Sequence, residues 1–184
     1  MSRPAKAQSR HPAGSRTHGA GVLREERHDA YRSDEKAASG TTCPDCHAQV
    51  QEGRWQWPSA HAKGAGHRTS ADRAAIARRC PACARLHAHD PAGELTLTGR
   101  YVQAHEAELR ALMHHEAQRE AAFHPLERLM SLNKLPEGGL RITTTGLHLP
   151  RMLAHALERA HHGSLQITYA DGESRVRVKW HREG

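Results

Sequence analysis

The sequence predicts an α+β protein built from a cysteine-bearing piece, a helical segment and a small β-α-β-β module. Three observations predict it. All four cysteines fall in two C-P-x-C pairs, apolar residues recur at helical spacing in the middle of the chain, and apolar and polar residues alternate near its end. The boundaries that we expect are 1–38, 39–99, 100–135 and 136–184.

The first piece, residues 1–38, is rich in Ser, Arg, Ala, Gly and His and carries few large apolar side chains. Such a segment cannot bury enough surface to offset the entropy lost on ordering, so we expect a disordered arm. Eight basic and five acidic residues make this arm basic. A basic arm can lie along a phosphate backbone, but a merely solvated tail has the same composition.

The whole chain has 184 residues, a net charge of +7 and only 4% aromatic residues. A basic balance favours polyanionic partners such as nucleic acid or the ribosome. The N-terminus has no apolar run typical of a signal peptide, and no stretch approaches the roughly 20 apolar residues of a membrane span. We therefore expect a cytoplasmic protein without a membrane partner.

The cysteine-bearing piece, residues 39–99, lacks a conventional core. Its seven large apolar residues cannot hold the rest by burial alone, so a further stabilising element is needed. We expect Trp55 and Trp57, on one side of a strand, to belong to the small core, although they could also stack on bases. The seven residues are Val50, Trp55, Trp57, Ile76, Leu86, Leu95 and Leu97.

The two cysteine pairs can supply the missing element. A redox pair or plain free thiols are the alternatives, but a redox pair would require one lone CxxC in a βαβ setting. Two C-P-x-C turns instead provide the four thiolates of a closed zinc site, which has no open position for catalysis. We therefore expect a zinc ribbon with one structural Zn²⁺, bound by Cys43, Cys46, Cys80 and Cys83.

The spacing between the two pairs is 33 residues, longer than the roughly 15–20 of a simple ribbon, and indicates an insertion. We expect a flexible loop at 60–70 and a short helix at 72–79. His47, His87 and His89 lie near enough in the sequence to replace a cysteine, and they are second-choice ligands.

The middle of the chain predicts a short strand followed by helices. The strand is expected at 94–99, and apolar residues then recur at helical spacing from Tyr101 to Met113. Pro125 interrupts this pattern. Because proline is best placed in the first turn of a helix, a second helix is expected to begin near His124–Met130.

That second helix would place His124, Glu127 and Arg128 on about one turn. The three residues are a candidate site, or they mark a helix start with an acidic side chain near the positive end of the dipole. The motifs H-E-x-x-H, G-x-S-x-G and G-x-x-x-x-G-K-[ST] are absent. The HAHD stretch at 87–90 resembles the HxH of metal hydrolases, which lie on far longer barrels. An enzyme is therefore the less favoured hypothesis.

The last piece predicts a strand at 140–145, a helix with Pro150 in its first turn, and a hairpin over 164–180. One face of the resulting sheet packs on the helix. The other face is expected to carry Arg141, Thr143, Gln166, Thr168, Arg175, Arg177 and Lys179.

Alternation in RVRVKW places basic side chains in one exposed row, which suits contacts to phosphates, although a solvated antiparallel face has the same pattern. This face lacks stacking aromatics and the chain has no GxxG loop, so it matches neither an RRM nor a KH reader. The residues that we expect to contact nucleic acid are Arg54, Arg141, Arg175, Arg177 and Lys179.

The ordered motifs CPDC, GRWQW, CPAC, PAGELTLTG, HPLERLM and ITTTGLHL resemble a family of short proteobacterial zinc-ribbon proteins over about residues 28–182. More distantly, two CxxC knuckles before a strand–helix–strand piece are similar to the N-terminal zinc region of the archaeal and eukaryotic large-ribosomal-subunit export adaptor linked to nonsense-mediated decay. This second resemblance implies zinc knuckles and a ribosomal or rRNA partner.

Three functions follow as hypotheses. The first is a zinc-ribbon protein that binds RNA, on the ribosome, through its basic face. The second is a protein-interaction adaptor that uses the helix at 100–131 as its partner surface. The third and least favoured is a small hydrolase around His124, since no small-molecule substrate is evident from the sequence.

Overall fold

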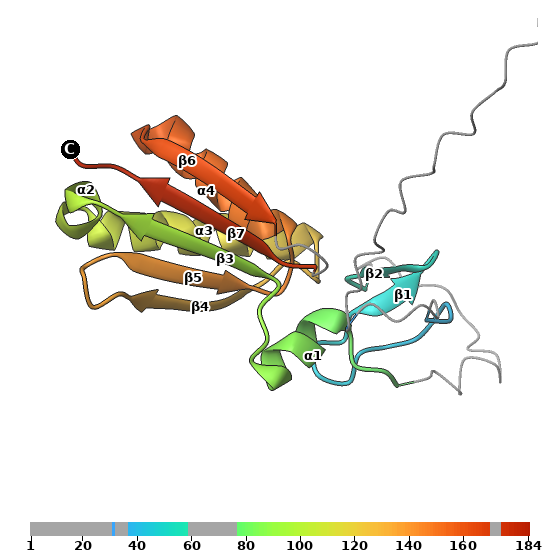
Figure 1. Cartoon of the computed structure of the whole chain (residues 1–184). Helices are drawn as coiled ribbons and strands as arrows, with labels where there is room; N and C mark the ends of the chain where they lie inside the picture. Colours follow the sequence, from blue (N-terminus) through green and yellow to red (C-terminus); the bar gives the residue numbers. More distant parts are fainter. Residues whose placement is uncertain (1–30, 32–36, 59–76, 170–173) are drawn as a thin grey trace, which may run out of the picture.

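The computed structural model describes Tyr31 and residues 37–58, 77–169 and 174–184. In this part of the chain a small hairpin and a short helix lie beside the cysteines, and a five-stranded sheet with helices on one face follows (Figure 1). The loop expected at 60–70 lies outside the described residues, as do nearly all of the arm expected at 1–38 and most of the helix expected at 72–79. The described end of that last segment is not helical, because Ala77 forms an isolated β-bridge with Thr42.

The hairpin pairs β1 (Gln49–Gln51) with β2 (Arg54–Gln56) in antiparallel register. Glu52 and Gly53 connect the strands, and both have positive φ angles, of 52° and 74°. Two-residue turns of this kind match the right-handed twist of the strands that they join. The hairpin buries Val50 on one side, and the cross-strand partner of Val50 is Trp55.

Helix α1 (Pro81–Ala88) begins directly after Cys80, contains Cys83 and leads into the large sheet. Pro81 occupies the first turn, where its missing N–H costs nothing and its fixed φ angle favours the helix. The helix ends at Ala88, and the C-cap residue His89 adopts a left-handed conformation (φ 52°) that closes the last turn.

The large sheet has the strand order β4-β5-β3-β7-β6. Its central pair, β3 and β7, is parallel, and all other neighbours are antiparallel. The strands are β3 (Gly93–Thr98), β4 (Leu129–Lys134), β5 (Leu140–Thr144), β6 (Ser164–Tyr169) and β7 (Val176–His181).

The described helices of this part pack on a single face of the sheet (Figure 1). They are α2 (Arg100–Ala104), α3 (Glu106–Phe123) and α4 (His148–His161). Alternation along β3 and β7 sends Leu95, Leu97, Val178 and Trp180 into the core between sheet and helices. The opposite face is covered by none of the described helices.

Two elements differ from the sequence-based predictions. The strand expected at 94–99 forms, but it pairs with β5 and β7, so it is the central strand of the large sheet and not a part of the cysteine-bearing piece. The helix expected near His124–Met130 is wrong. α3 ends at Phe123, a turn follows, and strand β4 begins at Leu129 because this segment pairs with β5. Pairing partners decide such ambiguous apolar segments more than local preference does.

The C-terminal elements agree with the sequence. The strand at 140–144, the helix with Pro150 in its first turn and the two hairpin strands are all present. Val176, Val178 and Trp180 are buried as the alternation predicts, while the turn at 170–173 lies outside the described residues. None of the described helices is long and apolar enough to cross a membrane.

Candidate metal centre

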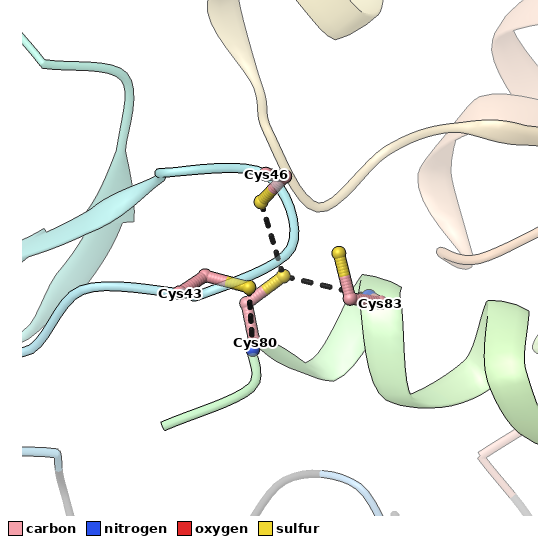
Figure 2. A group of neighbouring side chains, drawn as sticks. All are labelled: Cys43, Cys46, Cys80 and Cys83. Carbon is pink, nitrogen blue, oxygen red and sulfur yellow. Dashed lines mark hydrogen bonds between the residues drawn. The ribbon is translucent and has the colours of Figure 1, made fainter. Parts of the chain in front are cut away.

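The first cysteine pair lies in a tight turn before β1 (Figure 2). The amide of Cys43 donates to the carbonyl of Ala48 at 2.8 Å, and the amide of His47 donates to the carbonyl of Cys43 at 2.9 Å. His47 adopts a left-handed conformation with a φ of 64°, which turns the chain back toward the hairpin. The turn therefore holds the sulfurs of Cys43 and Cys46 on one side.

The second cysteine pair begins helix α1. Cys80 is the N-cap residue, and its sulfur accepts the amide of Cys83 at 3.4 Å. The amide of Cys80 itself donates to the sulfur of Cys43 at 3.3 Å, which joins the two pairs directly. Cys80 and Cys83 lie three residues apart across the first helical turn, so their side chains face the same point.

The prediction that the four cysteines meet is confirmed. Their sulfur atoms all lie within 4.8 Å of one another, and those of Cys46 and Cys80 are 3.7 Å apart. Four sulfurs placed tetrahedrally about 2.3 Å from a zinc ion would be separated by about 3.8 Å. All four cysteines are free thiols. The cluster is thus close to the size that a metal ion requires.

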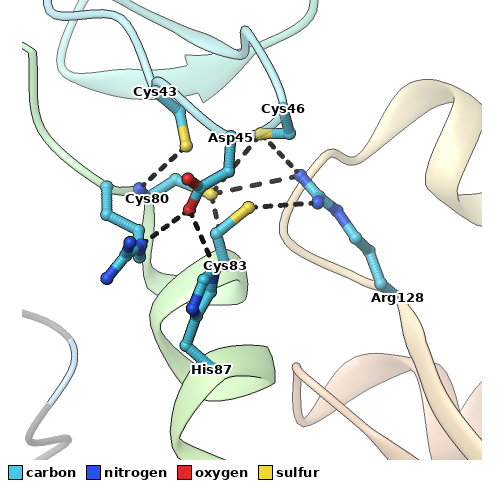
Figure 3. A network of polar contacts seen from close by, with 8 residues as sticks. Cys43, Asp45, Cys46, Cys80, Cys83, His87 and Arg128 are labelled. Atoms are coloured by element: carbon cyan, nitrogen blue, oxygen red, sulfur yellow. Dashed lines mark hydrogen bonds and ion pairs between the residues drawn. The ribbon is translucent and has the colours of Figure 1, made fainter.

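The histidines considered as substitute ligands do not join this group. Among the described residues, the group that can hold a metal contains cysteines alone. The ring of His87 instead lies 3.4 Å from a carboxylate oxygen of Asp45, which also accepts the Nε of Arg79 at 2.6 Å (Figure 3). These contacts bind α1 and the residue just before Cys80 to the first cysteine turn.

The environment of the thiols favours a bound cation. Burial alone would raise the pKa of the Cys43 thiol, but backbone amides of Cys80, Cys46 and Asp45 point toward its sulfur and lower that pKa to about 7. Burial raises the pKa of Cys83 to about 11, and it also raises the pKa of Cys80. Burial of Cys80 and Cys83 thus opposes their ionisation, and a metal ion held by all four sulfurs would offset that cost, because it would bind them as thiolates.

Arg128 is a member of the site that sequence reasoning did not associate with the cysteines. One terminal nitrogen of its guanidinium donates to the sulfur of Cys46 at 3.0 Å, and the other donates to the sulfur of Cys83 at 3.4 Å (Figure 3). Arg128 comes from the connector between α3 and β4, 45 residues after Cys83. No local signal in the sequence links positions so far apart.

The two tryptophans, both expected in the small core, occupy different places. Trp55 packs against the cysteine cluster. Trp57 lies beyond it, where its indole N–H donates to the carbonyl of Ala121 at 2.7 Å and the guanidinium of Arg128 lies 5.3 Å from its ring. Trp57 therefore connects the hairpin to the end of α3. Both rings are half-buried.

The candidate set of His124, Glu127 and Arg128 does not form a shared site. Glu127 accepts the amide of Leu149 at 2.9 Å and so caps the N-terminus of α4, and burial raises its pKa. His124 is exposed, with its ring 3.6 Å from Glu120. Arg128 contacts the cysteine sulfurs, so the three side chains have three separate partners.

The predicted basic residues fall in three places. Arg141, Arg177 and Lys179 are exposed on the open face of the large sheet. Arg175 precedes β7, and its guanidinium donates to Asp90 at 2.8 Å instead of extending that row. Arg54 is exposed on β2, in the separate small hairpin.

Glu94 lies within the basic row. It is the register partner of Arg177, and its carboxylate is 3.8 Å from the guanidinium of Arg141. The other described residues of this face on the three central strands are polar, including Thr96, Thr98 and Thr143. The face is therefore polar with a positive excess.

Comparison of the chain with protein-family models, with curated proteins and with solved structures gave no match. The fold and the cysteine cluster thus define the chain by structure alone: an α+β protein with a four-cysteine candidate metal site.

Proposed function

We propose that this chain is a binding protein in which a structural zinc ion fixes the cysteine-bearing part and the open face of the large sheet contacts RNA. The four sulfurs support a closed site without an open coordination position, and such sites stabilise a fold and do not catalyse reactions. Thiolate-only coordination is typical of structural zinc. The resemblances seen in the sequence point to the ribosome as the place where such RNA would be met.

The observation that carries the RNA proposal is the open face of the sheet. Arg141 projects from β5, and Arg177 and Lys179 project from β7; these two strands flank β3. The threonines between them can donate to phosphate oxygens. The described part of this face has no Phe, Tyr or Trp on which bases would stack. We therefore expect contacts to the backbone of RNA, with little preference for base sequence.

The test is a fluorescence-anisotropy titration of labelled single-stranded RNA over a series of salt concentrations. Replacing Arg141, Arg177 and Lys179 together by glutamine should weaken binding. It should also reduce the slope of log affinity against log salt by about 2, since each phosphate contact contributes about 0.7.

A matched control removes the same charge from the helical layer, by replacing Arg119, Arg151 and Arg159, which are exposed on α3 and α4. If the two triple variants weaken binding equally, the effect is one of net charge and the sheet face is not the site. The alternative is a protein-interaction adaptor. It would be favoured by a protein partner that stays bound in a pull-down after ribonuclease treatment and at high salt.

A further inference from the structure

Arg128 is held at its backbone and at its Nε by residues other than the cysteines. Its Nε donates to the carbonyl of Pro125 at 2.6 Å. The backbone amide of Arg128 donates to the hydroxyl of Thr145 at 2.9 Å, and the amide of Thr145 donates back to the carbonyl of Arg128 at the same distance. A side chain held at both its backbone and its Nε loses little further freedom when its two terminal nitrogens bind sulfur.

Those terminal nitrogens face most of the cluster. One lies 3.0 Å from the sulfur of Cys46 and 4.0 Å from that of Cys80, and the other lies 3.4 Å from that of Cys83 (Figure 3). A planar guanidinium that donates two parallel N–H groups suits a pair of neighbouring anionic acceptors better than a single ammonium does. The arrangement is thus specific to arginine.

The charge of a loaded site explains why a cation is needed there. Four thiolates around one divalent zinc leave two net negative charges, and Cys43, Cys80 and Cys83 are almost fully buried. Buried charge is costly unless it is paired and hydrogen-bonded. Arg79 also lies near, but its guanidinium is bound to the carboxylate of Asp45, which offsets its charge.

We propose that Arg128, held in place by Thr145 at the end of β5, is the positioning and charge-compensating residue of the metal site. The proposal rests on the zinc site proposed above. The neighbouring residue, Glu127, caps α4 through the amide of Leu149, and Thr145 also donates to the carbonyl of Leu126 at 2.7 Å. One short connector therefore joins the sulfurs to the end of β5 and to the start of α4.

The experiment compares Arg128→Met, Arg128→Lys and the control Arg110→Met in the full chain. Arg110 is also a partly buried arginine that binds a backbone carbonyl, that of Leu132, but it does not touch a sulfur. The readouts are the rate of zinc transfer to a chelator and the sulfur-to-cobalt charge-transfer bands of the Co²⁺-substituted protein.

We expect Arg128→Met to bind zinc about 10–100-fold more weakly, as when other outer partners of metal ligands are removed, and so to release it faster and to shift the charge-transfer bands. Arg128→Lys keeps the charge but not the paired N–H groups, so its rate of zinc release should lie between those of wild type and Arg128→Met. If Arg128→Met folds poorly, a release rate of Arg128→Lys above that of wild type still tests the inference. Arg110→Met should match wild type.

Two results would overturn the inference, and they are distinguishable. Release rates and cobalt spectra for both Arg128 variants that equal those of wild type would remove the role of Arg128 and leave the metal site intact. A wild-type protein that takes up neither zinc nor cobalt would remove the metal site, and with it this inference.

Discussion

Removing the metal should loosen the cysteine-bearing part and leave the large sheet folded. In residues 37–58 and 77–90, Val50 is the only large aliphatic side chain that is fully buried among those described. Burying one such side chain contributes about 1.5–3 kcal/mol. A structural zinc site contributes on the order of 10 kcal/mol at neutral pH, so most of the free energy that orders this part is expected to come from the ion.

The large sheet does not depend on the ion in the same way. Its core contains Leu95, Ile142, Leu153 and Trp180 with eleven further buried residues, and none of the four cysteines belongs to that cluster. Each of these large side chains stabilises the sheet without the metal. Chelation should therefore unfold the cysteine-bearing part while the large sheet stays folded.

The assay is amide hydrogen exchange of the zinc-loaded and chelator-treated protein at the same pH. Protection at Cys43, Val50 and the first turn of α1 should fall to nearly that of an unfolded chain, while β3, β5 and β7 keep theirs. Addition of zinc should restore the lost protection, which controls for damage by the chelator. Equal protection in both states would refute the reasoning, and so would loss of the whole sheet.

Three further predictions concern single positions, each measured by denaturant unfolding. Burial raises the pKa of the Glu127 carboxyl, so the protonated group stabilises the fold most below the ordinary glutamate pKa, and this contribution is lost as pH rises through the raised value. Glu127→Gln should remove this pH dependence of stability. Glu127→Ala should cost about 1 kcal/mol, because the amide of Leu149 loses its acceptor. Trp57→Phe should cost about 1 kcal/mol, since the carbonyl of Ala121 loses its donor. Gly99→Ala should cost about 1–3 kcal/mol or more, because φ is 105° and the added methyl would meet backbone.

The sequence by itself determined the chemistry of the cysteines and the outline of the C-terminal elements. Two C-P-x-C turns in a segment that is poor in apolar residues indicate a shared metal site, because each turn presents two sulfurs to one side whatever the rest of the chain does. Alternation in RVRVKW likewise assigns Val176, Val178 and Trp180 to the core, since successive residues of any strand face opposite sides.

Only the tertiary structure decided where those elements belong. The strand at 93–98 and the strand at 129–134 join one sheet through partners distant in the chain, and the second of them has a local pattern that also suits a helix. The same holds for Arg128, which reaches sulfurs 45 and 82 residues away, and for Arg175, which turns to Asp90. Local preference acts over a few residues, whereas strand pairing and ion pairing are settled by which distant groups the fold brings within contact distance.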